Sequence, residues 1–277
     1  MTNTPTTFFG WIIFLIQQYH GYYLQGLLTT LETSLAGTIC GCFLGFLVGI
    51  IQATDIRAQD NMIKKILLGI PWVIAKIYVT IFRGTPMIVQ AMVIYYGSST
   101  VFGIDLKPFN AAIFIILLNT GAYMSETVRG GIVSIDPGQT EGAKAIGMNH
   151  WQTMIHVILP QALRNIIPQI GNNFIINIKD TSVLSVISIT DLFFVHKSVV
   201  GALYTYFESA AIVMVIYLTM TLFASYLLRL WEKALDGPQN YDLNTTDSLA
   251  YTSGMYNAPD PNHESQNLDM KGGAAHV

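Results

Sequence analysis

The residues of this chain that could bind a charged solute are ionisable side chains inside long hydrophobic stretches. They are Arg83, Glu126, Arg129, Lys179 and Asp180. A charge inside the hydrocarbon layer of a membrane is costly, so such residues usually face a bundle interior or a water-filled path and mark the route of a solute or ion. Neutral polar residues in the same stretches could supply further hydrogen bonds: Thr85, Gln90, Asn172, Asn173 and Ser182.

Each charged residue also has a structural interpretation. Glu126 and Arg129 are one helical turn apart and could simply pair with each other. Lys179 and Asp180 could cap a broken helix, and Arg83 could extend its guanidinium to the membrane interface. The sequence alone leaves the binding and the structural interpretations open.

Other kinds of site have little support. Cys40 and Cys42 stand in a hydrophobic run without further metal ligands nearby, and the histidines are isolated, so we expect no metal site. A phosphate-binding Gly-Lys-Ser/Thr motif does not occur, and we expect no catalytic residue and no cofactor in this chain. The net charge of -3 gives no support for a nucleic-acid partner.

The composition indicates that lipid surrounds much of the chain. Hydrophobic residues make up 52% and charged residues 11%, whereas charged residues make up roughly 25% of a soluble domain. Because a spanning helix needs about 20 mostly apolar residues, the sequence predicts an all-α polytopic membrane protein with about five transmembrane helices. The predicted spans are residues 24–51, 66–98, 110–128, 162–185 and 209–230.

Three of these spans carry unusual features. Glycines recur every fourth residue in the first span, which predicts a face where another helix backbone approaches closely; they are Gly37, Gly41, Gly45 and Gly49. The second is interrupted by Arg83-Gly84-Thr85-Pro86, so we expect a kinked or broken helix. The fourth is so polar that it can cross only beside protein or water.

The chain divides into three parts. Residues 1–21 are rich in aromatic residues and resemble an external, interfacial segment. Residues 22–235 hold the spans, and residues 236–277 have a composition typical of a disordered tail. The distribution of lysine and arginine predicts an external N-terminus and a cytoplasmic C-terminus, which places the loop of residues 136–160 in the cytoplasm.

The loop of residues 136–160 is predicted to be an ordered elbow. Asp136-Pro137 is a favourable helix start, and Gly147 can end that helix in a left-handed conformation. Asn149 can then cap a second short helix, with Gln152 completing a capping box. A rigid elbow of this kind can receive force from a partner, although an ordinary pair of interfacial helices would show the same pattern.

The elbow resembles the EAA loop of permeases of ATP-binding-cassette (ABC) importers. Glu141-Gly142-Ala143, Gly147 and Leu159-Pro160 follow the spacing of that loop, with Gly142 in place of alanine and Val157 in place of isoleucine. Three more segments resemble the polar-amino-acid branch, with glutamine/glutamate permeases most similar. They are Phe82 to Pro86, Glu126 to Gly131 and Lys179 to Ser182.

This resemblance implies a type I importer permease whose cytoplasmic coupling elbow docks on a separate ATPase. The implied coupling residues are Glu141, Ala143, Lys144, Gly147 and His150. The implied partners are an ATPase dimer that carries ATP and Mg, a second permease chain, an extracellular substrate-binding protein and membrane lipid. The substrate would be a polar amino acid, either glutamine/glutamate or a basic one, and the protein would lie in the cell membrane.

An amino acid crossing such a permease needs partners for both of its charges. Arg83 is expected to meet the carboxylate, since a guanidinium can form two parallel hydrogen bonds with it. Asp180 is expected to meet the ammonium, with Glu126 as the rival. A channel or secondary transporter, or a scaffold that transports nothing, would also explain a polar bundle, but neither accounts for the elbow.

Overall fold

The first helix begins at Thr7, whose side chain accepts a hydrogen bond from the amide of Gly10 (3.3 Å). No proline or run of charge follows, so α1 (Phe8–Ala53) continues for 46 residues. That is about 69 Å of helix, roughly twice the thickness of a hydrocarbon core. The structure is a computed structural model, and it describes residues 5–54 and 62–236.

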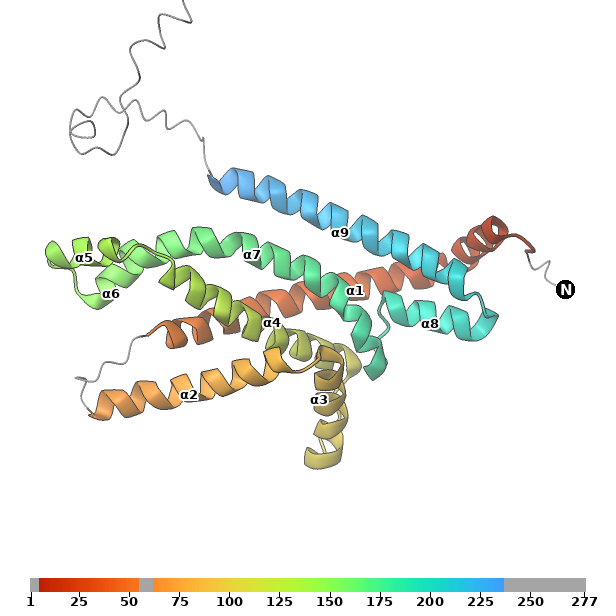
Figure 1. Cartoon of the computed structure of the whole chain (residues 1–277). Helices are drawn as coiled ribbons and strands as arrows, with labels where there is room; N and C mark the ends of the chain where they lie inside the picture. The colour runs from red at the N-terminus through yellow and green to blue at the C-terminus, as the bar shows by residue number, and fades with distance from the viewer. Residues whose placement is uncertain (1–4, 55–61, 237–277) are drawn as a thin grey trace, which may run out of the picture. The chain divides into compact units, whose positions relative to one another are not determined.

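The remaining helices follow in chain order (Figure 1). Between α1 and the elbow lie α2 (Met62–Gly84), α3 (Met87–Phe102) and α4 (Pro108–Val133). The elbow and the polar span consist of α5 (Pro137–Ala145), α6 (His150–Thr153), the π-helix η1 (Met154–Ile158) and α7 (Leu159–Asp180). The chain then forms the 3-10 helix η2 (Thr181–Ile187), α8 (Leu192–Leu203) and α9 (Tyr206–Asp236).

Within the described ranges, four helices are long and apolar enough to cross a membrane: α1, α2 from Ile66, α4 and α9. A fifth crossing exists if His150–Ile187 and Leu192–Leu203, which are bent by 50°, count as one broken span. The predicted all-helical class is therefore confirmed, and four to five candidate spans stand where about five were predicted.

The N-terminal segment differs from the expectation. Residues 1–21 were expected to be separate from the first span, but α1 is continuous across residue 21. Leu15 is fully buried and belongs to one apolar cluster with Leu192 and Ile212, and the rings of Phe8 and Phe207 are 5.3 Å apart. One side of the early turns of α1 therefore packs against α8 and α9, whereas Phe9, Ile13 and Ile16 remain exposed.

The glycines of α1 lie against α4. A β-carbon added at Gly41 would be 2.7 Å from Cβ of Thr120, and one added at Gly49 would be 2.7 Å from the carbonyl oxygen of Ser125. Gly37 and Gly45 meet Ile116 and Met124 in the same way. Real β-carbons need more room than this. The close packing of α1 against α4 therefore depends on having glycine, which has no side chain, at these four positions.

The two ends of the bundle have different structures (Figure 1). The helices α5 and α6 lie together at one end, and α8 lies at the other. The first turns of α1 are at the α8 end, and α9 runs back toward the elbow. The described residues up to Ala234 form one compact unit. The tail predicted for residues 236–277 lies, except for Asp236, outside the described residues.

Candidate functional site

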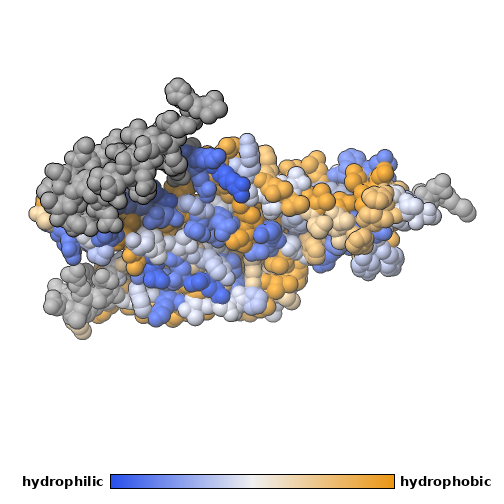
Figure 2. All heavy atoms as spheres, turned by 45° about the horizontal axis from the view of Figure 1, so that its top comes forward, coloured by the Kyte–Doolittle hydropathy of each residue, from blue (hydrophilic) through white to orange (hydrophobic). Residues whose placement is uncertain are grey.

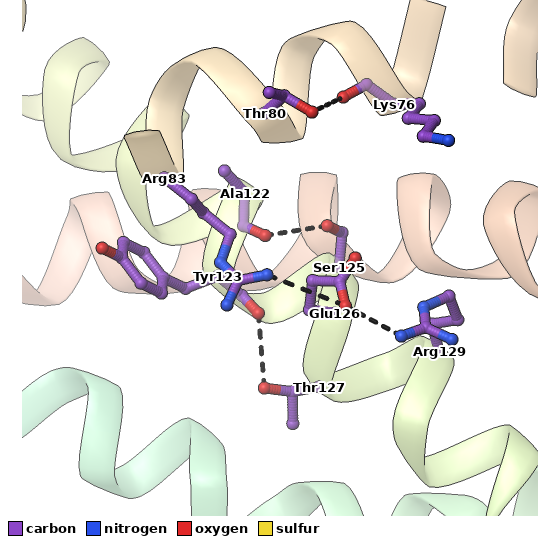
Figure 3. A network of polar contacts seen from close by, with 9 residues as sticks. All are labelled: Lys76, Thr80, Arg83, Ala122, Tyr123, Ser125, Glu126, Thr127 and Arg129. Carbon is purple, nitrogen blue, oxygen red and sulfur yellow. Dashed lines mark hydrogen bonds and ion pairs between the residues drawn. The ribbon is translucent and has the colours of Figure 1, made fainter. Parts of the chain in front are cut away.

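A cluster of charges joins α2 to α4 (Figure 3). Oε2 of Glu126 accepts a hydrogen bond from Nη2 of Arg129 (2.9 Å) and lies 3.7 Å from Nη1 of Arg83. The guanidinium of Arg83 also lies 5.5 Å from the ring centroid of Tyr123. The three charged side chains are 30–43% exposed, so they are open to the space beside α2 and α4.

The break between α2 and α3 is held by neutral polar groups. The side-chain Nε2 of Gln90 lies 2.8 Å from the carbonyl oxygens of Phe82 and Thr85 and 2.9 Å from the hydroxyl of Thr85, so its two N–H groups are shared among three acceptors. Asn119 on α4 donates to the amide oxygen of Gln90 (3.1 Å). These bonds satisfy carbonyl groups that are left free where Pro86 ends α2. Thr85 and Gln90 therefore fix the backbone on either side of Arg83.

The exposed face of α7 is polar. Asn165, Gln169 and Asn172 are exposed and spaced by four and three residues, which puts them on one side of the helix. Lys179 is exposed two turns further on. Figure 2 shows hydrophilic side chains gathered on one face of the molecule, next to hydrophobic ones. Asn165 and Gln169 were not predicted as site residues, although their helical spacing with Asn172 was a usable signal.

Asn177 points the other way, into the bundle. Its side chain is 4% exposed and donates to the hydroxyls of Thr38 on α1 (2.7 Å) and Thr120 on α4 (2.8 Å). It therefore ties three helices together at one buried point.

Replacing Asn177 with alanine should destabilise the bundle, because both hydroxyls lose a donor. Interhelical hydrogen bonds in membranes contribute on the order of 0.6–1.7 kcal/mol each, so we expect a melting temperature lower by about 3–6 °C in detergent. The exposed Asn172→Ala change on the same helix is the control and should shift melting little. Equal shifts in the two variants would show that the buried bonds contribute nothing special.

The C-terminal end of α7 leads into a cavity. Lys179 and Ser182 line an open cavity of about 360 Å³ together with His196 and Tyr217. Asp180, the next residue after Lys179, is partly buried.

Among the described residues, the ion pairs of Arg83 and Arg129 are both with Glu126. Arg83 thus lies beside Glu126, the alternative to Asp180 as the residue that meets the ammonium of the substrate. The assignment of Arg83 and Asp180 to the two ends of an amino acid remains a prediction.

The elbow has the local structure expected from its capping residues. Oδ1 of Asp136 accepts from the amide of Gly138 (2.6 Å), and Gly147 has φ +86°, a conformation that favours glycine. Asn149 and Gln152 form the capping box, with both hydrogen bonds at 2.9 Å. The turns on either side of Gly147 are thus fixed by side-chain and backbone geometry.

The elbow presents both charge and apolar surface. Glu141, Lys144 and His150 are exposed, whereas Ala143 is buried, with 6% exposure. Two large apolar side chains that were not predicted are strongly exposed there: Ile146 at 79% and Trp151 at 71%. Exposed aromatic and aliphatic groups at a rigid surface are typical of protein interfaces.

The residues that the structure describes contain no group of three or more histidine, cysteine or acidic side chains that could hold a metal ion.

Most of the chain is similar to known transport proteins. Residues 66–237 match the family described as "Binding-protein-dependent transport system inner membrane component". The glutamine transport system permease protein GlnP of Escherichia coli is 33% identical over 213 residues, which cover 76% of this chain and 92% of that protein. The arginine transport system permease protein ArtQ of Bacillus subtilis is 32% identical over 77% of this chain and 92% of that protein.

The fold of this chain is also similar to that of solved ABC transporter structures. A chain from the crystal structure of an amino acid ABC transporter with histidines has a TM-score of 0.70 and 33% identity, covering 79% of this chain and 96% of that chain. A chain of the inward-facing MetNI methionine ABC transporter has a TM-score of 0.61 at 19% identity, with coverage of 79% and 96%; at that identity the likeness concerns the fold.

Proposed function

Because this chain belongs to the family of binding-protein-dependent transport system inner membrane components, we propose that it carries a polar amino acid across the membrane along the polar faces of α2, α4 and α7. It is a multi-pass membrane protein and the permease subunit of an ABC importer. Glutamine and arginine are the substrates named for two of its relatives, and both are polar amino acids.

The elbow is the observation that carries the proposed coupling. It is held by capping hydrogen bonds and lies at one end of the bundle. Its exposed side chains include Glu141, Lys144, Ile146 and Trp151. A cytoplasmic ATPase dimer docked on this surface would bind ATP and Mg, while this chain contributes no cofactor. The apolar groups Ile146 and Trp151 would fill a pocket on the ATPase, and Glu141 would pair with one of its cations.

Exposed charge on α2 and α4 supports the proposed path. Charged side chains facing lipid are costly, so Arg83, Glu126 and Arg129 must border water or protein in the complete assembly. A second permease chain facing them would close the path, and an extracellular binding protein would deliver the amino acid. Thr85, Gln90 and Asn172 would then shape the wall, with Lys179, Asp180 and Ser182 at the end of α7.

The orientation gives a prediction of its own. In a variant without Cys40 and Cys42, Thr100→Cys at the end of α3 should react with a membrane-impermeant maleimide on intact cells. Ser134→Cys, beside the elbow, should react only after permeabilisation, because the proposed orientation puts the elbow on the cytoplasmic side. The reverse pattern would contradict the proposed orientation of both termini.

Uptake by the complete assembly tests the function. The full chain is reconstituted in proteoliposomes with an ATPase and a binding protein from the same genome, and radiolabelled glutamine, glutamate and arginine are offered outside. We expect ATP-dependent accumulation of at least one of them. Equal accumulation without ATP would instead support a channel or secondary transporter.

A further inference from the structure

We propose that the open cavity between the end of α7, α8 and α9 is an oxyanion-binding site, which takes the carboxylate of an amino acid or the phosphate of a phospholipid. The cavity has a volume of about 360 Å³. Three polar side chains that line it come from three successive elements: Lys179 from α7, Ser182 from η2 and His196 from α8. The cavity therefore offers an ammonium, a hydroxyl and an imidazole to one ligand.

The ammonium of Lys179 is the charge that an oxyanion would meet. Lys179 is exposed, and in the part of the chain that the structure describes the acid of both ion pairs is Glu126, so no acidic side chain pairs with Lys179. Asp180 and Glu208 are nearby in the chain but do not line the cavity. Asp191 is fully buried and accepts from two backbone amides at the start of α8. The lining thus carries a positive charge that is not neutralised.

His196 is oriented by hydrogen bonds on its inner side. Its Nδ1 lies 2.9 Å from the hydroxyl of Ser209, which lies 3.5 Å from the hydroxyl of Tyr23. Both of these partners are buried. Tyr23 can donate to Ser209, which leaves the one hydroxyl hydrogen of Ser209 for Nδ1. Nε2, on the other edge of the ring, then carries the N–H and is the nitrogen left for a ligand.

The remaining wall of the cavity is apolar. Val213 and Met214 of α9 line it, and so does Phe193, whose ring centroid is 5.4 Å from that of His196. Two charges interact more strongly where the surroundings are less polar than water. Hydrogen bonds to an ionised acceptor are also stronger than those between neutral groups. The wall therefore favours an oxyanion at Lys179, with its apolar remainder lying against α9.

Two sources of an oxyanion can reach this cavity. Lys179 follows Asn172 by seven residues, so both lie on one side of α7, and the cavity is at the end of the polar face that the proposed path uses. A carboxylate would then belong to an amino acid on that path, a source that rests on the proposed function. A phosphate would belong to a phospholipid beside the bundle, a source that does not depend on transport.

Isothermal titration calorimetry distinguishes these sources. The complex of the full chain with its ATPase, in dodecyl maltoside and without nucleotide, is titrated with L-glutamine and with dihexanoyl phosphatidylglycerol. The matched probes without an oxyanion are glutamine α-amide and dihexanoylglycerol. We expect at least one oxyanion probe to bind about tenfold more tightly than its matched probe. Lys179→Gln should weaken that binding at least about tenfold, and His196→Ala or Ser182→Ala at least about threefold, whereas Lys179→Arg should retain it.

Lys197→Gln is the matched control, because Lys197 is an exposed lysine next to His196 that does not line the cavity. Its affinity should equal that of the wild type. Dependence on Lys179 for glutamine alone would identify the amino acid as the source, and for the phospholipid alone would identify the lipid. No preference for either oxyanion probe, unchanged affinity in both Lys179→Gln and His196→Ala, or an equal loss in Lys197→Gln would overturn the inference. ATP-driven uptake by the complete assembly is measured separately and would still support the proposed function in each of these cases.

Discussion

Glu141→Lys should reduce ATP-driven uptake at least about thirtyfold while the protein still inserts and folds. Glu141 is exposed on α5, so reversing its charge disturbs no buried contact within the chain. At the proposed ATPase interface, however, losing one desolvated charge pair costs on the order of 2–5 kcal/mol, and 2 kcal/mol corresponds to about a thirtyfold change. Uptake and substrate-stimulated ATP hydrolysis in proteoliposomes measure the effect.

Two further variants sharpen this test. Glu141→Gln removes the charge without reversing it and should have an intermediate effect. Glu232→Lys reverses a charge on α9, outside the elbow, and should leave uptake near the wild-type rate. If Glu141→Lys transports normally with the ATPase bound, Glu141 is not an anchor of the interface.

Gly45→Leu should prevent α1 and α4 from packing. A β-carbon at Gly45 would lie 2.5 Å from Cβ of Met124 and 2.8 Å from the carbonyl oxygen of Gly121. Neither atom is the flexible end of a side chain, so the helices themselves must separate. Overpacking of a core costs about 1–3 kcal/mol or more, and we expect the purified variant to aggregate or to melt at least about 5 °C lower.

Gly69 provides the comparison for this change. It lies on α2, where an added β-carbon would meet nothing within 4 Å. Gly69→Leu should therefore leave the melting temperature nearly unchanged. A similar loss in both variants would mean that leucine destabilises through helix propensity or lipid contact, and that the α1–α4 approach is not the cause.

Local signals explain which features could be predicted from sequence. The elbow depends on Asp136, Gly147 and Asn149, each of which acts on backbone within a few residues, so its pattern could be read directly. The break of the second span could be predicted for the same reason, because Pro86 acts on the residues beside it.

Contacts between distant segments explain the rest. Residues 8–21 belong to α1, and the packing of Leu15 against α8 and α9 depends on segments far away in the chain. The ion pair of Arg83 with Glu126 depends on how α2 crosses α4, which no local pattern in the sequence indicates. Similarly, Asn172 and Asn177 look alike in sequence, and only the packing of α7 decides that one is exposed and the other is buried.

The π-helix Met154–Ile158 has a consequence for the angular position of the elbow. A π-turn holds one residue more than an α-turn, and each residue of an α-helix turns the chain by about 100°. The five residues of η1 therefore set the direction in which α5 and α6 leave the axis of α7. A change in this one turn would redirect the whole docking surface around that axis, with every capping bond of the elbow intact.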